Sequence, residues 1–129
     1  MRTARLMGRI AATDRTFTFH DGEWVGKCLI CGGPLRFDAE TGDGANIEHI
    51  LPRTLGGGND LRNLGITHPR CNGEKGRNWD SGRRRRGQPD RYQLLVGRLL
   101  AQRALRWRPP DVEGAEGDST PNAEGAWQA

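Results

Sequence analysis

The stretch from Glu48 to Gly76 reads EHILPRTLGGGNDLRNLGITHPRCNGEKG, and the rest of the chain is organised around it. It holds two of the three histidines, one of the three cysteines, and three of the four asparagines that precede residue 78. Three consecutive glycines, Gly56 to Gly58, lie in its middle. Such a concentration of metal-binding and proton-transferring groups indicates a functional site.

Composition limits what surrounds this site. A chain of 129 residues forms one domain at most, with room for tails. Only 34% of the residues are hydrophobic, which predicts a small core that needs a metal or disulfides for stability. No run approaches the roughly 18 apolar residues of a membrane span, and the N-terminal residues lack the apolar segment of a signal peptide. We therefore expect a cytoplasmic protein with no membrane partner.

The three cysteines are an odd number, which argues against a disulfide framework. Cys28 and Cys31 form a CxxC pair, and His68 precedes Cys71 at the same spacing. Zinc in structural sites takes four such ligands tetrahedrally, so the two pairs predict one structural Zn²⁺ in a reducing compartment. A redox CxxC is the alternative, but the βαβ pattern that surrounds such a motif in thioredoxin-like proteins is not visible.

Charge is distributed unevenly along the chain. Residues 70–108 hold twelve basic and three acidic side chains, a net of +9, whereas residues 109–129 hold five acidic and no basic ones, a net of −5. A basic block directly after the site predicts a polyanionic partner. For the run 83–86 we favour contact with the DNA backbone over a solvated loop, with a nuclear localisation signal as a third interpretation. The expected nucleic-acid contacts are Arg53, Lys75, Arg83, Arg84, Arg85 and Arg86.

Local patterns predict short helices and strands of both kinds. We expect a helix over 3–12, a hairpin over 16–25 that turns at Asp21-Gly22, and a strand that begins at Leu35. The site itself should form a ββα unit: strand 45–51, glycine-rich loop 53–63, strand 64–67, and a helix from Pro69 or Arg70 to about Gly76. Residues 77–89 are expected to be a linker and 109–129 to be disordered. The last helix should run from Asp90 to about Trp107, with a buried face of Leu94, Leu95, Leu99, Leu100 and Leu105 and with Arg98, Arg103 and Arg106 outside it.

The chemistry of the stretch suits phosphodiester hydrolysis. That reaction needs an activated water, charge neutralisation at the phosphate and stabilisation of the leaving oxygen. His49 is the natural general base, because the unperturbed pKa of imidazole, ~6.5, is close to working pH. Glu48 and the amide of Asn72 supply oxygen ligands for a hard divalent cation. Asn63 is expected either to accept a hydrogen bond from the imidazole or to hold the loop through backbone hydrogen bonds.

These residues resemble the HNH nuclease family, the ββα-metal nucleases. The resemblance rests on Cys28-x-x-Cys31, Glu48-His49-Ile50-x-Pro52, Gly56-Gly57, Asn63-Leu64 and Cys71-Asn72-x-x-Lys75-Gly76. It covers residues 28–76, and its composite pattern is specific although each piece alone is weak. His68 stands where many members have a cysteine.

The resemblance implies a role for each matching residue. His49 matches the general base, Asn63 an orienting residue, and Glu48 and Asn72 the ligands of the catalytic metal. Glutamate replaces the more common aspartate, and asparagine replaces the more common histidine at the last position. Because these are oxygen ligands, we expect Mg²⁺ or Mn²⁺ rather than catalytic Zn²⁺.

The sequence as a whole predicts a small zinc-stabilised α+β endonuclease that hydrolyses DNA, and we expect this DNA to be double-stranded. The alternative is a non-catalytic, zinc-stabilised nucleic-acid-binding module. The expected organisation is an N-terminal helix and hairpin (1–27), the nuclease core (28–78), a basic linker and C-terminal helix (79–108) and an acidic tail (109–129).

Overall fold

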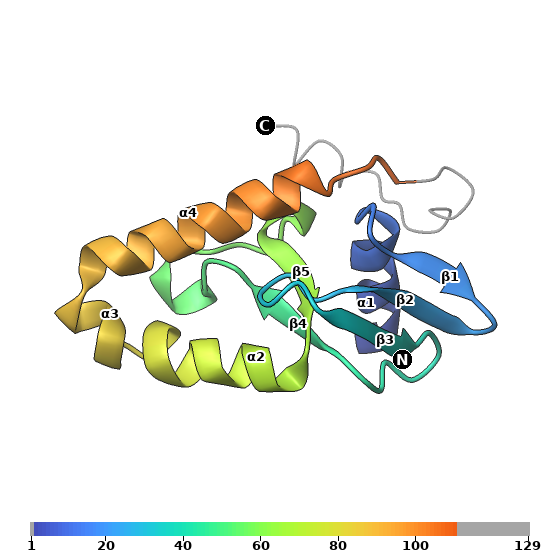
Figure 1. The fold of residues 1–129 in the computed structure, drawn as a ribbon, viewed down its shortest axis with the longest axis horizontal. Helices are drawn as coiled ribbons and strands as arrows, with labels where there is room; N and C mark the ends of the chain where they lie inside the picture. Colours follow the sequence, from blue (N-terminus) through green and yellow to red (C-terminus); the bar gives the residue numbers. More distant parts are fainter. Residues whose placement is uncertain (1, 111–129) are drawn as a thin grey trace.

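The computed structural model describes residues 2–110, and these form an α+β fold with two small antiparallel sheets (Figure 1). The first sheet has the order β1-β2-β3 and the second pairs β4 with β5. Helices flank the sheets, as the sequence predicts. In chain order the main elements are α1 (Arg2–Ala12), β1 (Thr18–His20), β2 (Glu23–Lys27), β3 (Pro34–Asp38), β4 (Asn46–His49), β5 (Leu64–Thr67), α2 (Pro69–Lys75), α3 (Arg83–Gly87) and α4 (Pro89–Leu105).

The predicted hairpin is confirmed. β1 and β2 pair with Phe19 opposite Trp24 and His20 opposite Glu23, so the turn falls at Asp21-Gly22. Both turn residues have positive φ, 52° and 78°, which is the backbone of a tight two-residue turn. β3 then pairs with β2, and the chain from Cys28 to Gly33 that joins them carries the CxxC motif.

The predicted ββα unit is also confirmed. β4 pairs antiparallel with β5, with Glu48 opposite Gly65 and His49 opposite Leu64. β5 is buried along its whole length, which anchors the unit in the core. α2 begins at Pro69, where proline's missing N–H costs nothing because the first helical N–H groups have no intrahelical partner.

One hydrophobic cluster joins the N-terminal helix to both sheets. Met7, Ile10 and Ala11 of α1 pack with buried side chains of both sheets and of the connecting segments, which are Phe17, Cys28, Leu35, Phe37, Ala45, Leu61, Leu64 and Ile66. A smaller cluster of Leu29, Ile50 and Leu99 attaches α4. The ββα unit therefore rests on a frame built by α1, the three-stranded sheet and α4.

The glycine-rich loop is more ordered than the sequence suggests. It contains two short 3-10 helices, η1 (Arg53–Leu55) and η2 (Leu61–Asn63). A Cβ atom on Gly57 would lie 1.7 Å from the carbonyl oxygen of Leu51, so this glycine permits one backbone segment to pack directly on another. Close internal packing, and not only access for a phosphate backbone, thus accounts for a glycine here.

The expected linker over 77–89 is wrong. The chain after α2 continues as a π-helical segment, η3 (Gly76–Asp80), in which the Ser81 N–H donates to the Gly76 carbonyl at 2.8 Å. The short helix α3 follows, and Pro89 then begins α4. The glycines and arginines of this segment are typical of a loop. Its helical structure is stabilised by contacts with α2 and α4, which the local sequence does not reveal.

The predicted buried face of α4 is wrong in part. Leu99 is buried, but Leu94 and Leu105 are each 73% exposed and Leu100 is 39% exposed, whereas Arg103 is 0% exposed. The guanidinium of Arg103 donates to the carbonyls of Leu61, Leu64 and Thr13 and to the Thr13 hydroxyl, at 2.7–3.1 Å. Arg106 is also buried, at 8% exposed. Arginine here joins α4 to β5 and to the C-terminal end of α1, whose last carbonyls need partners.

Two further expectations concern the ends of the chain and membranes. The acidic tail expected to be disordered lies, from residue 111 onward, outside the described residues. Within residues 2–110, no helix combines the length and the apolar character that crossing a membrane requires.

Candidate functional site

Cys28, Cys31, His68 and Cys71 converge on one point, although they come from two parts of the chain. Their sulfur and imidazole nitrogen atoms all lie within 4.8 Å of one another. The Cys31 sulfur is 3.4 Å and the Cys71 sulfur 3.8 Å from His68 Nδ1. Four ligands around a tetrahedral zinc ion are separated by about 3.4–3.8 Å, given bond lengths of 2.0–2.3 Å. The group is therefore able to hold a metal ion.

Hydrogen bonds with backbone groups orient the side chains of this group. The N–H groups of Cys31 and His68 point at the Cys28 sulfur, at 3.5 and 3.4 Å, and the Gly33 N–H points at the Cys31 sulfur at 3.3 Å. His68 Nε2 lies 2.9 Å from the carbonyl oxygen of Pro34. A carbonyl only accepts, so Nε2 carries the proton and Nδ1 presents its lone pair to the group.

The environment shifts the pKa values of the two more accessible thiols, those of Cys31 and Cys71, in opposite directions. The hydrogen bond from the Gly33 N–H lowers the pKa of Cys31 to about 7. Burial, followed by the neighbouring cysteines, raises the pKa of Cys71 to about 12. Since a thiol that coordinates a metal is deprotonated outright, metal binding would reverse the effect on Cys71.

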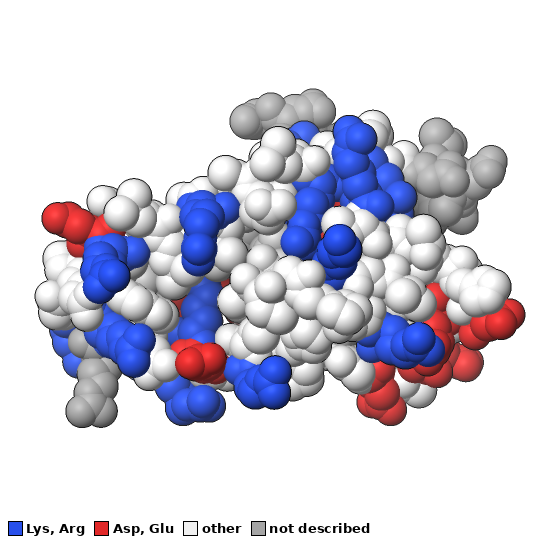
Figure 2. Space-filling model, viewed as in Figure 1, with Lys and Arg blue, Asp and Glu red and all other residues white. Residues whose placement is uncertain are grey.

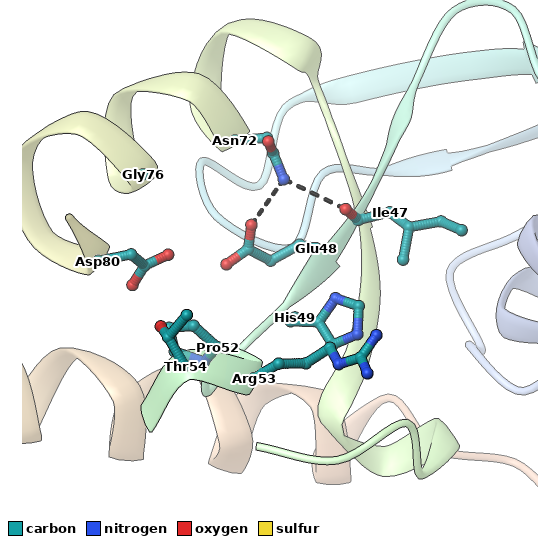
Figure 3. Close-up of a pocket in the computed structure, with 9 residues that line it drawn as sticks. All are labelled: Ile47, Glu48, His49, Pro52, Arg53, Thr54, Asn72, Gly76 and Asp80. Carbon is teal, nitrogen blue, oxygen red and sulfur yellow. Dashed lines mark hydrogen bonds between the residues drawn. The ribbon is translucent and has the colours of Figure 1, made fainter. Parts of the chain in front are cut away.

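A pocket of about 260 Å³ opens beside the ββα unit (Figure 3). Its lining comes from the end of β4, from η1 and from the α2–η3 helix, and consists of Ile47, Glu48, His49, Pro52, Arg53, Thr54, Asn72, Gly76 and Asp80. Three of the predicted catalytic-site residues, Glu48, His49 and Asn72, thus line one space. Adjacent side chains of a strand face opposite sides, but here β4 ends at His49 and the pair opens around the pocket.

Glu48 and Asn72 are in direct contact. The Asn72 amide nitrogen donates to Glu48 Oε1 at 2.7 Å and to the Ile47 carbonyl at 3.2 Å, as the dashed lines in Figure 3 mark. Glu48 is only 3% exposed, and burial raises the pKa of its carboxyl despite the opposing effect of Lys75. Its other oxygen, Oε2, lies 2.6 Å from the Lys75 ammonium.

His49 is oriented by a residue that the sequence did not single out. His49 Nε2 lies 2.9 Å from the amide oxygen of Asn59. With the proton on Nε2, the lone pair of Nδ1 is the one available to accept a proton. Asn59 follows the three glycines, and the only signal for it was its place in an asparagine-rich stretch.

Asn63 contacts the loop and not the imidazole. Its amide oxygen accepts from the Leu51 N–H at 2.9 Å, and its nitrogen donates to the carbonyls of Leu51 and Gly58 at 3.0 and 2.9 Å. Of the two expectations for Asn63, the structure shows the backbone-holding one. Asn63 thereby fixes the segment that follows His49 and the segment that precedes Asn59.

Lys75 does not occupy the position expected of a phosphate contact. Its side chain is 3% exposed, and its ammonium contacts Glu48 and both oxygens of Asp80 at 2.6–2.9 Å. Most lysines are solvated, but two carboxylates hold this ammonium in the interior, so the expected phosphate contact is wrong. Asp80, which falls in the predicted linker, lines the pocket instead.

The other expected nucleic-acid contacts lie on or near the surface. Arg53 is exposed and lines the pocket, and Arg84 and Arg86 are exposed on α3. Arg85 is partly buried beside Tyr92, and for Arg83 the structure describes the backbone alone. Figure 2 shows basic side chains over α2, α3 and α4 on this face, while most acidic ones gather at the other end, beside the three-stranded sheet.

Comparison with protein families gives a match over the region of the site. Residues 28–78 match the family described as HNH endonuclease. Neither the curated proteins nor the solved structures contain a match to this chain. The matched range contains the four clustered ligands and all the pocket residues except Asp80. Residues 28–78, which form a ββα unit with a group able to hold a metal ion, are therefore similar to the HNH endonuclease family.

Proposed function

We propose that this protein is a metal-dependent endonuclease that hydrolyses DNA phosphodiester bonds in the pocket between β4 and α2. The observation that carries the proposal is the convergence of His49, Glu48 and Asn72 on one pocket, within a segment that matches the HNH endonuclease family. A zinc-stabilised module without catalytic activity would have no need for this convergence.

His49 is the proposed general base. Asn59 holds the proton on Nε2, so that Nδ1 takes a proton from the attacking water. Asn63 fixes both backbone segments that present this pair. The exposed guanidinium of Arg53 at the pocket rim is suited to hold a phosphate oxygen.

The pocket also fits a divalent cation. Glu48 Oε2 contacts the Lys75 ammonium at 2.6 Å, and the Asn72 side chain lies against the same carboxylate through its amide nitrogen. Carboxylate and amide oxygens suit Mg²⁺ or Mn²⁺. Glu48 and Asn72 would hold this ion, which when bound supplies charge stabilisation at the scissile phosphate. Zinc is the proposed occupant of the Cys28–Cys31–His68–Cys71 group, whose donor set is that of structural zinc sites.

DNA is the proposed substrate, bound through its phosphate backbone by Arg53 and the arginines of α3. The test is nicking of supercoiled plasmid by the wild-type protein with Mg²⁺ or Mn²⁺, compared with His49→Ala. The proposal expects metal-dependent nicking that the variant loses. Wild-type protein that binds DNA yet cuts no single- or double-stranded substrate would support the non-catalytic alternative.

A further inference from the structure

The Lys75 ammonium is enclosed by oxygen atoms beside the pocket. It lies 2.6 Å from Glu48 Oε2, 2.8 and 2.9 Å from the two oxygens of Asp80, and 3.0 Å from the carbonyl oxygen of Ile50. An ammonium donates three hydrogen bonds, so these contacts satisfy it fully. Burial of a lysine at 4% exposure is unfavourable unless the charge is compensated, and two carboxylates compensate it here.

Asp80 reaches this position because the helix widens after α2. Residues five apart in an α-helix are separated by about 140° around its axis and do not share a face. The π-helical segment Gly76–Asp80 has a wider turn, which brings Asp80 under Lys75. π-Helical segments inserted after an α-helix occur often at functional sites.

Asp80 is also fixed from the other side. The Tyr92 hydroxyl of α4 donates to Asp80 Oδ1 at 2.7 Å, and the Tyr92 ring stacks on Trp79 with the ring centroids 6.1 Å apart. Asp80 is thus fixed between α4 and Lys75, and its place at the pocket is independent of any ligand.

The charges of this group bear directly on Glu48. Two carboxylates and one ammonium leave one negative charge next to the pocket. Because Asp80 shares the ammonium, Lys75 neutralises Glu48 only in part, and the carboxylate keeps attraction for an incoming cation. Without Asp80 the ammonium would pair with Glu48 alone and compete with that cation.

We propose that Asp80 and Lys75 are positioning residues of the nuclease pocket, which hold the Glu48 carboxylate in place and set its affinity for a divalent cation. This inference rests on the proposed function, since it takes Glu48 as a ligand of the catalytic metal. Asp80 acts through Lys75, and Lys75 acts through Glu48.

The test measures Mn²⁺ binding to zinc-loaded protein without DNA, by electron paramagnetic resonance, together with the dependence of cleavage on Mn²⁺ concentration. Asp80→Asn should raise the Kd for Mn²⁺ roughly tenfold, and cleavage should need a correspondingly higher Mn²⁺ concentration. Lys75→Met should lower the Kd for Mn²⁺, because the ammonium that competes with the cation is gone. It should also lower kcat, because Glu48 loses the partner that holds its carboxylate in place.

Matched controls are Asp90→Asn and Lys27→Met, which remove the same charges at exposed positions. Both should bind Mn²⁺ as the wild type does. If Lys75→Met does not fold, the double variant Lys75→Met/Asp80→Asn is compared with Asp80→Asn, and the proposal requires tighter Mn²⁺ binding in the double variant.

The outcomes separate this inference from the proposed function. A folded Asp80→Asn protein that binds Mn²⁺ with the Kd of the wild type would overturn the inference. The proposed function would still stand if the wild-type protein cleaves DNA. The Kd for Mn²⁺ could shift in opposite directions in Asp80→Asn and Lys75→Met while the wild-type protein cuts no DNA. That result would support the inference and overturn the proposed function. A wild-type protein that binds no Mn²⁺ would overturn the inference outright.

Discussion

Cys71 and Asn72 are consecutive residues of α2 that serve different sites: the Cys71 sulfur lies 3.8 Å from His68 Nδ1, and the Asn72 amide donates to Glu48 Oε1 at 2.7 Å. The helix that completes the group able to hold a metal ion therefore also carries a pocket residue. Any displacement of Cys71 moves Asn72 by a comparable distance, so the pocket depends on the metal-binding group for its geometry.

Cys71→Ser should lose both the structural metal and nuclease activity. Removing one of four ligands leaves a small core without the ion that we propose stabilises it, and binding of structural zinc is coupled to folding. We expect about one zinc per chain in the wild type, well below one in the variant, and a thermal unfolding transition that is lowered or absent. Zinc content by mass spectrometry and circular dichroism would measure both. Full zinc content in Cys71→Ser would contradict the four-ligand assignment.

His49→Ala should abolish cleavage with the fold intact. His49 lies at the end of β4 and is only partly buried, so its removal should change Tm by little. Loss of a general base should lower kcat by about 10²–10⁴-fold. Plasmid nicking and thermal unfolding measured on the same preparation would separate this result from that of Cys71→Ser. A variant that retains wild-type kcat would remove His49 from the mechanism.

Asn59→Ala should lower activity, whereas Asn63→Ala should lower stability. Asn59 contacts the imidazole, so its removal should lower kcat about tenfold with little change in stability. Asn63 makes three hydrogen bonds with the backbone of the loop, and its removal should destabilise the protein by about 2 kcal/mol. Urea unfolding and cleavage rates would test the pair. Equal loss of stability in both variants would argue against a specific role of Asn59 at the imidazole.

Arg103→Met should be among the most destabilising substitutions in α4. The guanidinium is fully buried and donates four hydrogen bonds, so its loss leaves several buried acceptors unsatisfied. We expect a loss of about 3 kcal/mol or more in the free energy of unfolding. The control is Leu94→Ala on the same helix, where 73% exposure predicts a change below about 0.5 kcal/mol. A larger loss of stability in Leu94→Ala than in Arg103→Met would instead support the buried leucine face that the sequence predicts.

The contrast between Arg103 and the cysteines shows which features were readable in the sequence. Metal ligands have a fixed number, chemistry and spacing, so Cys28, Cys31, His68 and Cys71 could be assembled without knowledge of the fold. The short strand Leu64–Thr67 could likewise be predicted from the local sequence, whereas its complete burial is a result of the fold. Arg103, Lys75 and Asp80 take their environment from segments far apart in the chain or from a π-helical turn that no local pattern predicts. Their residue types indicated solvent, and tertiary contacts reversed that indication.

The salt dependence of DNA binding should report on α3. Arg84 and Arg86 are exposed, and each phosphate that a basic side chain neutralises releases counterions from DNA. Removing one such contact should lower the slope of log K against log salt concentration by about one, so Arg84→Ala/Arg86→Ala should lower it by about two. Binding should weaken equally on unrelated sequences, because phosphate contacts carry no base information. Arg36→Ala is the control, since Arg36 is exposed on β3 and pairs with Glu23. Fluorescence anisotropy from 50 to 300 mM salt would measure the slopes, and an unchanged slope in the double variant would exclude these two arginines from the DNA interface.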